Sequence, residues 1–169
     1  MKMSSPKYEP NKWNQDILIR KSHNCYSYAL NKIEPYLISN CRKESKKKYF
    51  CRRKNPILSK KKITYYNCQS LVDNILKSNS RIKLISKNDP CPKDFYRVAL
   101  FLLIRKDNHH LTMNDFHFYR QDTNKLWSHK DGWRKATNKD KHGKLISNPE
   151  IAEKDNKSKL CAYFLFPNN

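Results

Sequence analysis

Three residues of this sequence have the types and surroundings that acyl-transfer chemistry uses, and the first is Cys25. It directly follows Asn24, a residue type that often caps the N-terminus of a helix, in a segment that reads as a helix start. Free N–H groups and partial positive charge at a helix N-terminus lower the pKa of a thiol placed there. Cys25 is therefore the candidate nucleophile. The alternative is a small apolar residue packed beneath the helix.

His117 is the candidate general base. In the strand-like segment 115–120, alternation places Asp115, His117 and Tyr119 on one face and the two phenylalanines on the other. A strand holds an imidazole rigidly, as general-base catalysis requires. The alternative is a half-exposed histidine on a sheet.

His129 ends the next strand-like segment, after a predicted turn at residues 121–124. If the two strands form a hairpin, His129 can bond the far ring nitrogen of His117 and fix its tautomer. Asn138 or Asp140 could orient His117 instead, because the sequence does not fix the register of the hairpin. A surface histidine near a turn is the remaining alternative.

The elements that must position these residues predict an α+β domain. A short helix is expected from Asn24 to a point before Pro35, and a longer one over 65–77, where apolar residues recur at helical spacing. Strands are expected over 96–105, 115–120, 125–129 and 160–166. Helices followed by strands indicate N-terminal helices packed on an antiparallel β-meander.

The chain of 169 residues is long enough for one core. We expect a single domain over residues 23–169, preceded by an irregular N-terminal arm of residues 1–22. Residues 130–158 are polar and are expected to form a long surface excursion.

The formal net charge is +21, and residues 41–62 contribute eleven basic residues against one acid. This stretch is predicted to be an exposed basic insertion, and such a field attracts nucleic acid or other polyanions. The candidate polyanion-binding residues are Lys46, Lys47, Lys48, Arg52, Arg53, Lys60, Lys61 and Lys62. A solubilising Lys-rich face is the alternative.

Several classes of protein are excluded or disfavoured. Two glycines cannot make a Gly-rich phosphate loop, and the longest apolar run, residues 98–104, is too short to span a membrane. The N-terminus lacks the apolar region of a classical signal peptide. Six dilute cysteines without that signal favour reduced thiols and an intracellular location, in the cytoplasm or in a virion.

A zinc site is disfavoured because the sequence contains no C-x₂-C pair. Its ligands would come from Cys41, Cys51, Cys68, Cys91, Cys161, His109 and His110. No metal and no cofactor is expected.

Taken together, the motifs resemble the NlpC-type, papain-like superfamily of cysteine amidases and peptidases. Asn24–Ala29, Asp115–Asp122 and Trp127–Gly132 are similar to the NCYxYA, D-aromatic-H-aromatic-YR-x-D and WSHK blocks of a poorly characterised group of bacterial and viral proteins. The resemblance covers about residues 23–166. It implies a papain-like fold and a site in which His117 activates Cys25.

In that site His129 is expected to orient His117, and backbone N–H groups at the start of the Cys25 helix to hold the oxyanion. Asn24 and Asp140 are further oxyanion-binding or orienting candidates. The resulting hypothesis is a cysteine-dependent amidase or peptidase that transfers an acyl group from a peptide or other amide through a thioester on Cys25. The alternative is a catalytically inactive basic protein that binds nucleic acid or serves as a structural or virion component.

Overall fold

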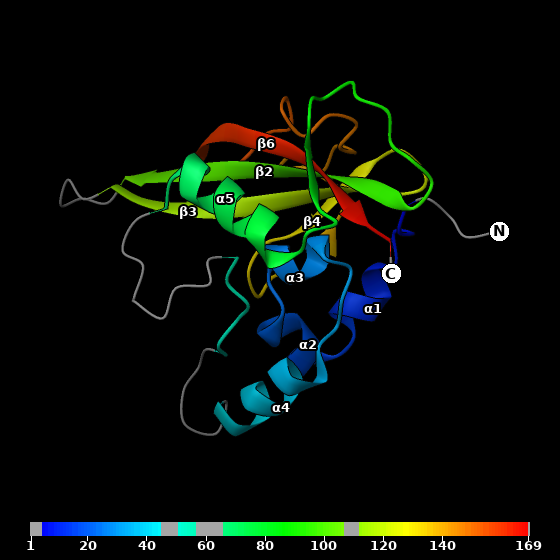
Figure 1. Cartoon of the computed structure of the whole chain (residues 1–169). Helices are drawn as coiled ribbons and strands as arrows, with labels where there is room; N and C mark the ends of the chain where they lie inside the picture. The colour runs from blue at the N-terminus through cyan, green and yellow to red at the C-terminus, as the bar shows by residue number, and fades with distance from the viewer. Residues whose placement is uncertain (1–4, 45–50, 57–65, 107–111, 169) are drawn as a thin grey trace.

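A computed structural model describes residues 5–44, 51–56, 66–106 and 112–168 (Figure 1). Eight residues singled out in the sequence lie outside these ranges: Lys46, Lys47, Lys48, Lys60, Lys61, Lys62, His109 and His110.

The described structure is α+β, as predicted, and is built on a six-stranded antiparallel sheet with the order β1-β6-β2-β3-β4-β5. The strands are β1 (Lys83–Ile85), β2 (Phe95–Lys106), β3 (Thr112–Gln121), β4 (Trp127–Lys130), β5 (Ala136–Thr137) and β6 (Lys157–Pro167). Strands β2, β3 and β4 form the first three strands of the predicted meander, whereas β5 lies in the segment expected to be a surface excursion. Strand β6 returns to pair with β2 on its other side and carries β1 at the edge.

Five helices accompany the sheet in the described ranges: α1 (Pro10–Asn14), α2 (Ile17–Ser22), α3 (Cys25–Ala29), α4 (Pro35–Glu44) and α5 (Cys68–Ser78). Helix α5 lies across one face of the sheet, over β2 and β3, with α3 beside it (Figure 1). Helices α2 and α4 lie beyond α3, away from the sheet (Figure 1), whereas α1 contacts β5. Helix α3 contacts β3 and β4, and α5 contacts β6.

Within the segment expected to be an irregular arm, Pro10–Asn14 and Ile17–Ser22 instead form the helices α1 and α2. Trp13 is 1% exposed and packs edge-on against Tyr28 of α3, with ring centroids 5.0 Å apart. Asn14 pairs with the backbone of Ala136 on β5 through two hydrogen bonds of 3.0 and 2.7 Å. The N-terminal segment is thus part of the same folded unit as the sheet.

The helix start predicted from the capping residue Asn24 is confirmed. Asn24 caps α3, and its Oδ1 accepts a hydrogen bond of 3.1 Å from the Ser27 N–H. That helix ends at Ala29, and Pro35 begins α4. The helix expected over 65–77 begins three residues later, at Cys68.

Each face of the sheet carries an apolar cluster. The face under α3 and α5 is filled by residues such as Leu71, Leu100 and Phe118, all fully buried. On the opposite face the segment after β4 covers the sheet, since Ile146 is 2% exposed and its carbonyl accepts a 2.8 Å hydrogen bond from the Trp127 N–H. The prediction of a purely surface excursion over 130–158 is therefore wrong at Ile146.

Four of the six cysteines are paired, as Cys41–Cys51 and Cys68–Cys161. The expectation of reduced thiols does not hold for these four cysteines, which are not available as thiolate ligands for zinc, whereas Cys25 and Cys91 are free. Across the described ranges no cluster of three or more His, Cys, Asp or Glu side chains is placed to hold a metal ion. No helix in those ranges is both long and apolar enough to cross a membrane.

Candidate active site

Cys25 occupies the first position of α3 and is buried, with 4% of its surface exposed. Its Sγ lies 3.8 Å from the carbonyl oxygen of Phe116 on β3, to which the thiol donates. Burial raises the pKa of the Cys25 thiol to about 12, and the nearby carboxylates of Asp115 and Asp131 act in the same direction. The expected lowering of this pKa by the helix N-terminus is wrong, because desolvation outweighs it. Cys25 is a neutral thiol at pH 7.

His117 and His129 meet as the hairpin prediction required. Strands β3 and β4 pair with Tyr119 opposite His129, so His129 lies diagonally across from His117. His117 Nε2 is 2.9 Å from His129 Nδ1, and His129 Nε2 is 3.2 Å from the carbonyl oxygen of Lys139. The three side chains pack as a triangle of rings, with centroids 4.8 to 5.0 Å apart.

The carbonyl of Lys139 determines which ring nitrogen carries the proton in His129 and in His117. A carbonyl can only accept, so His129 carries its proton on Nε2 and offers an unprotonated Nδ1. His117 must then donate from Nε2, which leaves Nδ1 of a neutral ring unprotonated and basic. Burial lowers the pKa of His129, which keeps that ring neutral and suited to accept. The arrangement prepares His117 to accept a proton at Nδ1.

A cavity of about 460 Å³ is lined by residues from the start of α3, from β3 and from the loop after β4. Cys25 and His117 both line it, together with Trp133, which is 53% exposed. His117 also borders a second cavity of about 210 Å³, which His129 and Tyr119 line. The nucleophile and base candidates thus face a shared space of a size that a peptide-like group could enter.

Asn24 lies beside Cys25 as a structural residue of the site. Besides capping α3, it donates through Nδ2 to the carbonyl of Lys54 at 2.8 Å. These two bonds hold both the first turn of α3 and the segment that passes over it. The side chain is therefore engaged with the backbone on both sides.

Asp140 and Asn138, the alternative orienting residues, are engaged elsewhere. Asp140 is half-buried, and its Oδ1 accepts hydrogen bonds of 2.9 Å from two backbone N–H groups in the turn that follows. The backbone carbonyl of Asn138 accepts from the Ile146 N–H at 3.0 Å. Of the three candidates for orienting His117, His129 is the one whose side chain contacts it among the described residues.

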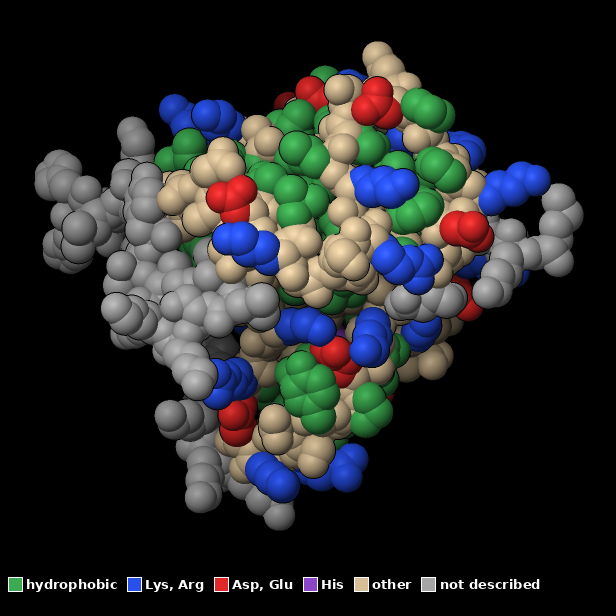
Figure 2. Space-filling view, viewed as in Figure 1, with side chains coloured by type: hydrophobic (Ala, Val, Ile, Leu, Met, Phe, Trp, Pro, Cys, Tyr) green, Lys and Arg blue, Asp and Glu red, His purple; other side chains and the backbone are tan. Residues whose placement is uncertain are grey.

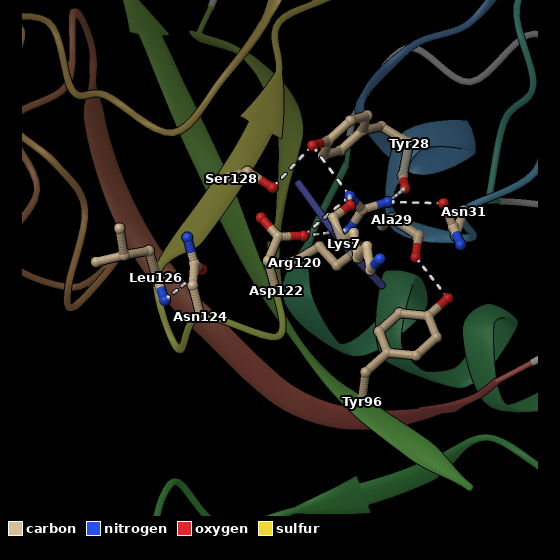
Figure 3. Close-up of polar contacts among 10 residues, drawn as sticks. All are labelled: Lys7, Tyr28, Ala29, Asn31, Tyr96, Arg120, Asp122, Asn124, Leu126 and Ser128. Carbon is tan, nitrogen blue, oxygen red and sulfur yellow. Dashed lines mark hydrogen bonds and ion pairs between the residues drawn. The ribbon is translucent and has the colours of Figure 1, made fainter. Parts of the chain in front are cut away.

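A buried polar cluster joins the Cys25 helix to the histidine strand (Figure 3). Arg120, 1% exposed, forms an ion pair of 2.9 Å with the fully buried Asp122. Its guanidinium donates to the carbonyl and the hydroxyl of Tyr28 at 3.2 and 3.1 Å, and its centre lies 4.2 Å from the centroid of that ring. The Tyr28 hydroxyl also contacts Ser128 Oγ at 2.8 Å. Tyr28 is three residues after Cys25 and Arg120 is three after His117, so this cluster fixes one against the other.

Lys130, directly after His129, makes a second link. It is fully buried, and its Nζ donates to the carbonyls of Arg20, His23 and Gly132 at 2.7, 2.6 and 2.6 Å. His23 is the residue before the cap of α3. The lysine therefore ties the end of β4 to the backbone that leads into Cys25.

Sequence reasoning missed the roles of Arg120, Asp122, Tyr28, Ser128 and Lys130, although all five belong to the motif blocks. The signal was their place beside the chemical candidates in three short blocks. Charged residues are rarely buried, so the residue types of Arg120, Asp122 and Lys130 alone do not indicate a buried role.

Two of the candidate polyanion-binding residues, Arg52 and Arg53, lie within the described ranges. Arg52 is exposed, whereas Arg53 is half-buried and lines the cavity of Cys25. The prediction that both belong to one exposed basic insertion is wrong for Arg53. On the face shown in Figure 2, the described Lys and Arg side chains lie singly or in small groups among other residue types.

Comparison with known proteins gives one similarity. The chain is 27% identical over 153 residues to insoluble matrix shell protein 1 of Ruditapes philippinarum, and the alignment covers 90% of this chain and 84% of that protein. No family model matches the chain. No solved structure matches it either. The similarity does not place the chain in a named family.

Proposed function

We propose that this protein is a cysteine-dependent acyl-transfer enzyme, an amidase or peptidase of the papain-like type. Cys25 is the nucleophile, His117 the general base and His129 the residue that orients it. The observation that supports this proposal is the hydrogen-bonded series Lys139 carbonyl, His129, His117, in which the His117 ring borders the cavity of Cys25. An imidazole held in one tautomer by a second polar group is the arrangement that a general base uses.

The reaction begins from a neutral thiol and a neutral imidazole. As the Cys25 Sγ attacks the substrate carbonyl carbon, its proton passes to His117 Nδ1 and the C–S bond forms. Backbone N–H groups at the start of α3 stabilise the oxyanion. The C–N bond then breaks, and the leaving amine takes the proton from His117. Water loses a proton to His117 and attacks the thioester, which releases the acid and restores the thiol.

Alkylation of Cys25 by iodoacetamide at pH 7 tests the base. The assay uses the oxidised protein with Cys91→Ser, because Cys91 is the second free thiol. Since the thiol pKa is raised, reaction at pH 7 depends on a base, and His117→Ala is expected to slow alkylation at least about tenfold. His142→Ala, a change to an exposed histidine, is the matched control and leaves the rate unchanged. Equal rates in His117→Ala and the parent refute the proposal.

A structural or binding role is the second candidate. It draws on the similarity to a shell matrix protein and on the net charge of +21. A basic binding protein retains DNA in a manner that weakens with salt and survives Cys25→Ser. Salt-dependent DNA retention that survives Cys25→Ser, together with an alkylation rate that does not depend on His117, would support the structural or binding role over the enzyme.

We also propose that the protein works in a non-reducing setting. The two disulfides support this, because such bonds persist outside the reducing cytosol, as in the extracellular space or on a virion. This replaces the expectation of a cytoplasmic location. Mass analysis of the natural protein without reductant tests it, and four free thiols at these cysteines contradict it.

A further inference from the structure

Residues 51–56, here named the strap, pass beside the N-terminus of α3. Four contacts hold it: the Cys41–Cys51 disulfide, the Asn24 bond to the Lys54 carbonyl, an ion pair of 2.9 Å from Lys54 Nζ to the buried Glu34, and a 2.7 Å bond from Asn55 Nδ2 to a tyrosine hydroxyl. The strap is therefore fixed to α4, to the cap of α3 and to the start of α5. A side chain that it turns toward Cys25 is held in place.

Arg53 is that side chain. Its Nε donates to the Lys21 carbonyl at 3.2 Å, which fixes the plane of the guanidinium. Its Nη1 lies beside Gly132, where a side-chain Cβ would be 3.8 Å away. The guanidinium therefore reaches the loop directly after β4, the strand of His129. Among the described residues, Lys21 is the hydrogen-bond acceptor of Arg53, and both Nη groups keep their N–H groups for another partner.

The other basic residues around this cavity are already paired. Lys54 is bound to Glu34, and Arg134 lies 3.8 Å from Asp131 and 3.6 Å from Asp155. Arg53 is thus the lining cation without an ion pair among the described residues, and the carboxylates of Asp115 and Asp131 in the same cavity act on it only at longer range. A guanidinium fork fits a carboxylate, which it binds with two parallel charge-assisted hydrogen bonds.

We propose that Arg53 binds a carboxylate of the substrate, so that the acyl compounds processed by Cys25 carry a carboxylate close to the reacting carbonyl. The inference rests on the proposed function for the reaction, whereas the anion site itself does not depend on catalysis. Peptides that end near the reacting bond, or acyl groups with an acidic side chain, have this chemistry. Neutral amides of the same size lack the group that Arg53 recognises.

Two reagents that differ only in this group provide the test. Iodoacetate and iodoacetamide alkylate a thiol by the same displacement of iodide, and only the first carries a carboxylate. The ratio of their rates at Cys25, measured by mass spectrometry in the Cys91→Ser protein without reductant, reports anion binding beside the sulfur. Arg53→Gln is expected to lower this ratio about tenfold, the effect of one lost charge-assisted contact.

Arg52→Gln is the matched control, because it removes the same charge from the adjacent, exposed position of the strap. Arg52→Gln is expected to leave the ratio of iodoacetate to iodoacetamide rates unchanged. Arg53→Lys is expected to give a ratio between those of the parent and Arg53→Gln. An unchanged ratio in Arg53→Gln, or an equal fall in Arg52→Gln, overturns the proposal. If His117→Ala does not slow alkylation but the rate ratio still depends on Arg53, the proposed enzymatic activity is refuted and the carboxylate site is retained.

A second measurement does not require reaction at Cys25. Trp133 lines the cavity and is half exposed, whereas Trp13 and Trp127 are buried. Titration with N-acetylglycine is expected to change tryptophan fluorescence in the parent and not in Arg53→Gln, while the uncharged N-acetylglycinamide changes neither. Equal responses to the two compounds contradict the carboxylate site even where Cys25 resists alkylation.

Discussion

Replacing Arg120 by Met is expected to destabilise the fold more than any surface substitution. The guanidinium donates to Asp122, to Tyr28 twice, to Asn31 at 3.0 Å and to the Lys7 carbonyl at 3.4 Å (Figure 3). Asp122 is 0% exposed, so the substitution leaves a buried carboxylate without its cation. Breaking a buried ion pair in this way costs about 3–5 kcal/mol. For a chain of this length, that corresponds to a fall in Tm of about 6–20 °C.

Urea unfolding followed by circular dichroism, under non-reducing conditions at pH 7, measures this cost. The double variant Arg120→Met, Asp122→Leu is expected to recover about 2 kcal/mol relative to the sum of the single changes, because no unpaired charge is then buried. The control is Arg134→Met, whose ion pairs are exposed and worth less than about 1 kcal/mol. A loss below about 1 kcal/mol in Arg120→Met, or strict additivity in the double variant, refutes the role given to this cluster.

Three further predictions concern a disulfide, pH and a helix cap. The Cys68–Cys161 bond closes a loop of 93 residues, so Cys68→Ala with Cys161→Ala is expected to lower the free energy of unfolding by about 3–5 kcal/mol in urea titrations; an unchanged midpoint contradicts this. Burial holds the pKa values of His23 and His129 below the ordinary 6.5. The unfolded chain therefore binds more protons than the folded one, and the free energy of unfolding falls as the pH drops below 6.5. Urea unfolding midpoints at pH 7.5 and pH 5 check this direction, and a higher midpoint at pH 5 contradicts it. Asn24→Ala removes the cap of α3 and is expected to lower the free energy of unfolding by about 1 kcal/mol in the same titration. Asn24→Asp keeps the capping oxygen but loses the Nδ2 hydrogen bond to the Lys54 carbonyl, so it is expected to recover only part of that loss.

The sequence predicted elements whose signals are local. Alternation around His117 gave its strand, and the capping type of Asn24 gave the start of α3, because each depends on neighbouring residues only. The contact of His117 with His129 also followed, since a short turn places adjacent strands side by side. These features required no knowledge of the tertiary structure.

Features that depend on distant parts of the chain were missed or predicted with the wrong sign. The pKa of Cys25 rises because the packed core removes water from the thiol, and a helix start alone indicates the opposite. The pairing of Cys68 with Cys161 depends on α5 lying against β6, which no cysteine spacing encodes. Buried Arg120 and Lys130 likewise require partners from three separate segments.

The placement of β6 shows the same limit. Its apolar pattern predicted a strand but not its neighbours, and it pairs with β2, more than fifty residues earlier in the chain. The predicted meander instead put it after the strand expected over 125–129, beside β4.

Formation of an acyl thioester on Cys25 tests the central claim most directly. The oxidised protein is mixed with a p-nitrophenyl ester, release of nitrophenolate is followed in time, and the adduct is located by mass spectrometry. The account predicts a burst with the acyl group on Cys25, loss of that burst in His117→Ala, and a slower burst in His129→Ala. Acylation of Cys25 at the same rate in all three proteins, or none on Cys25 in the parent, would contradict it.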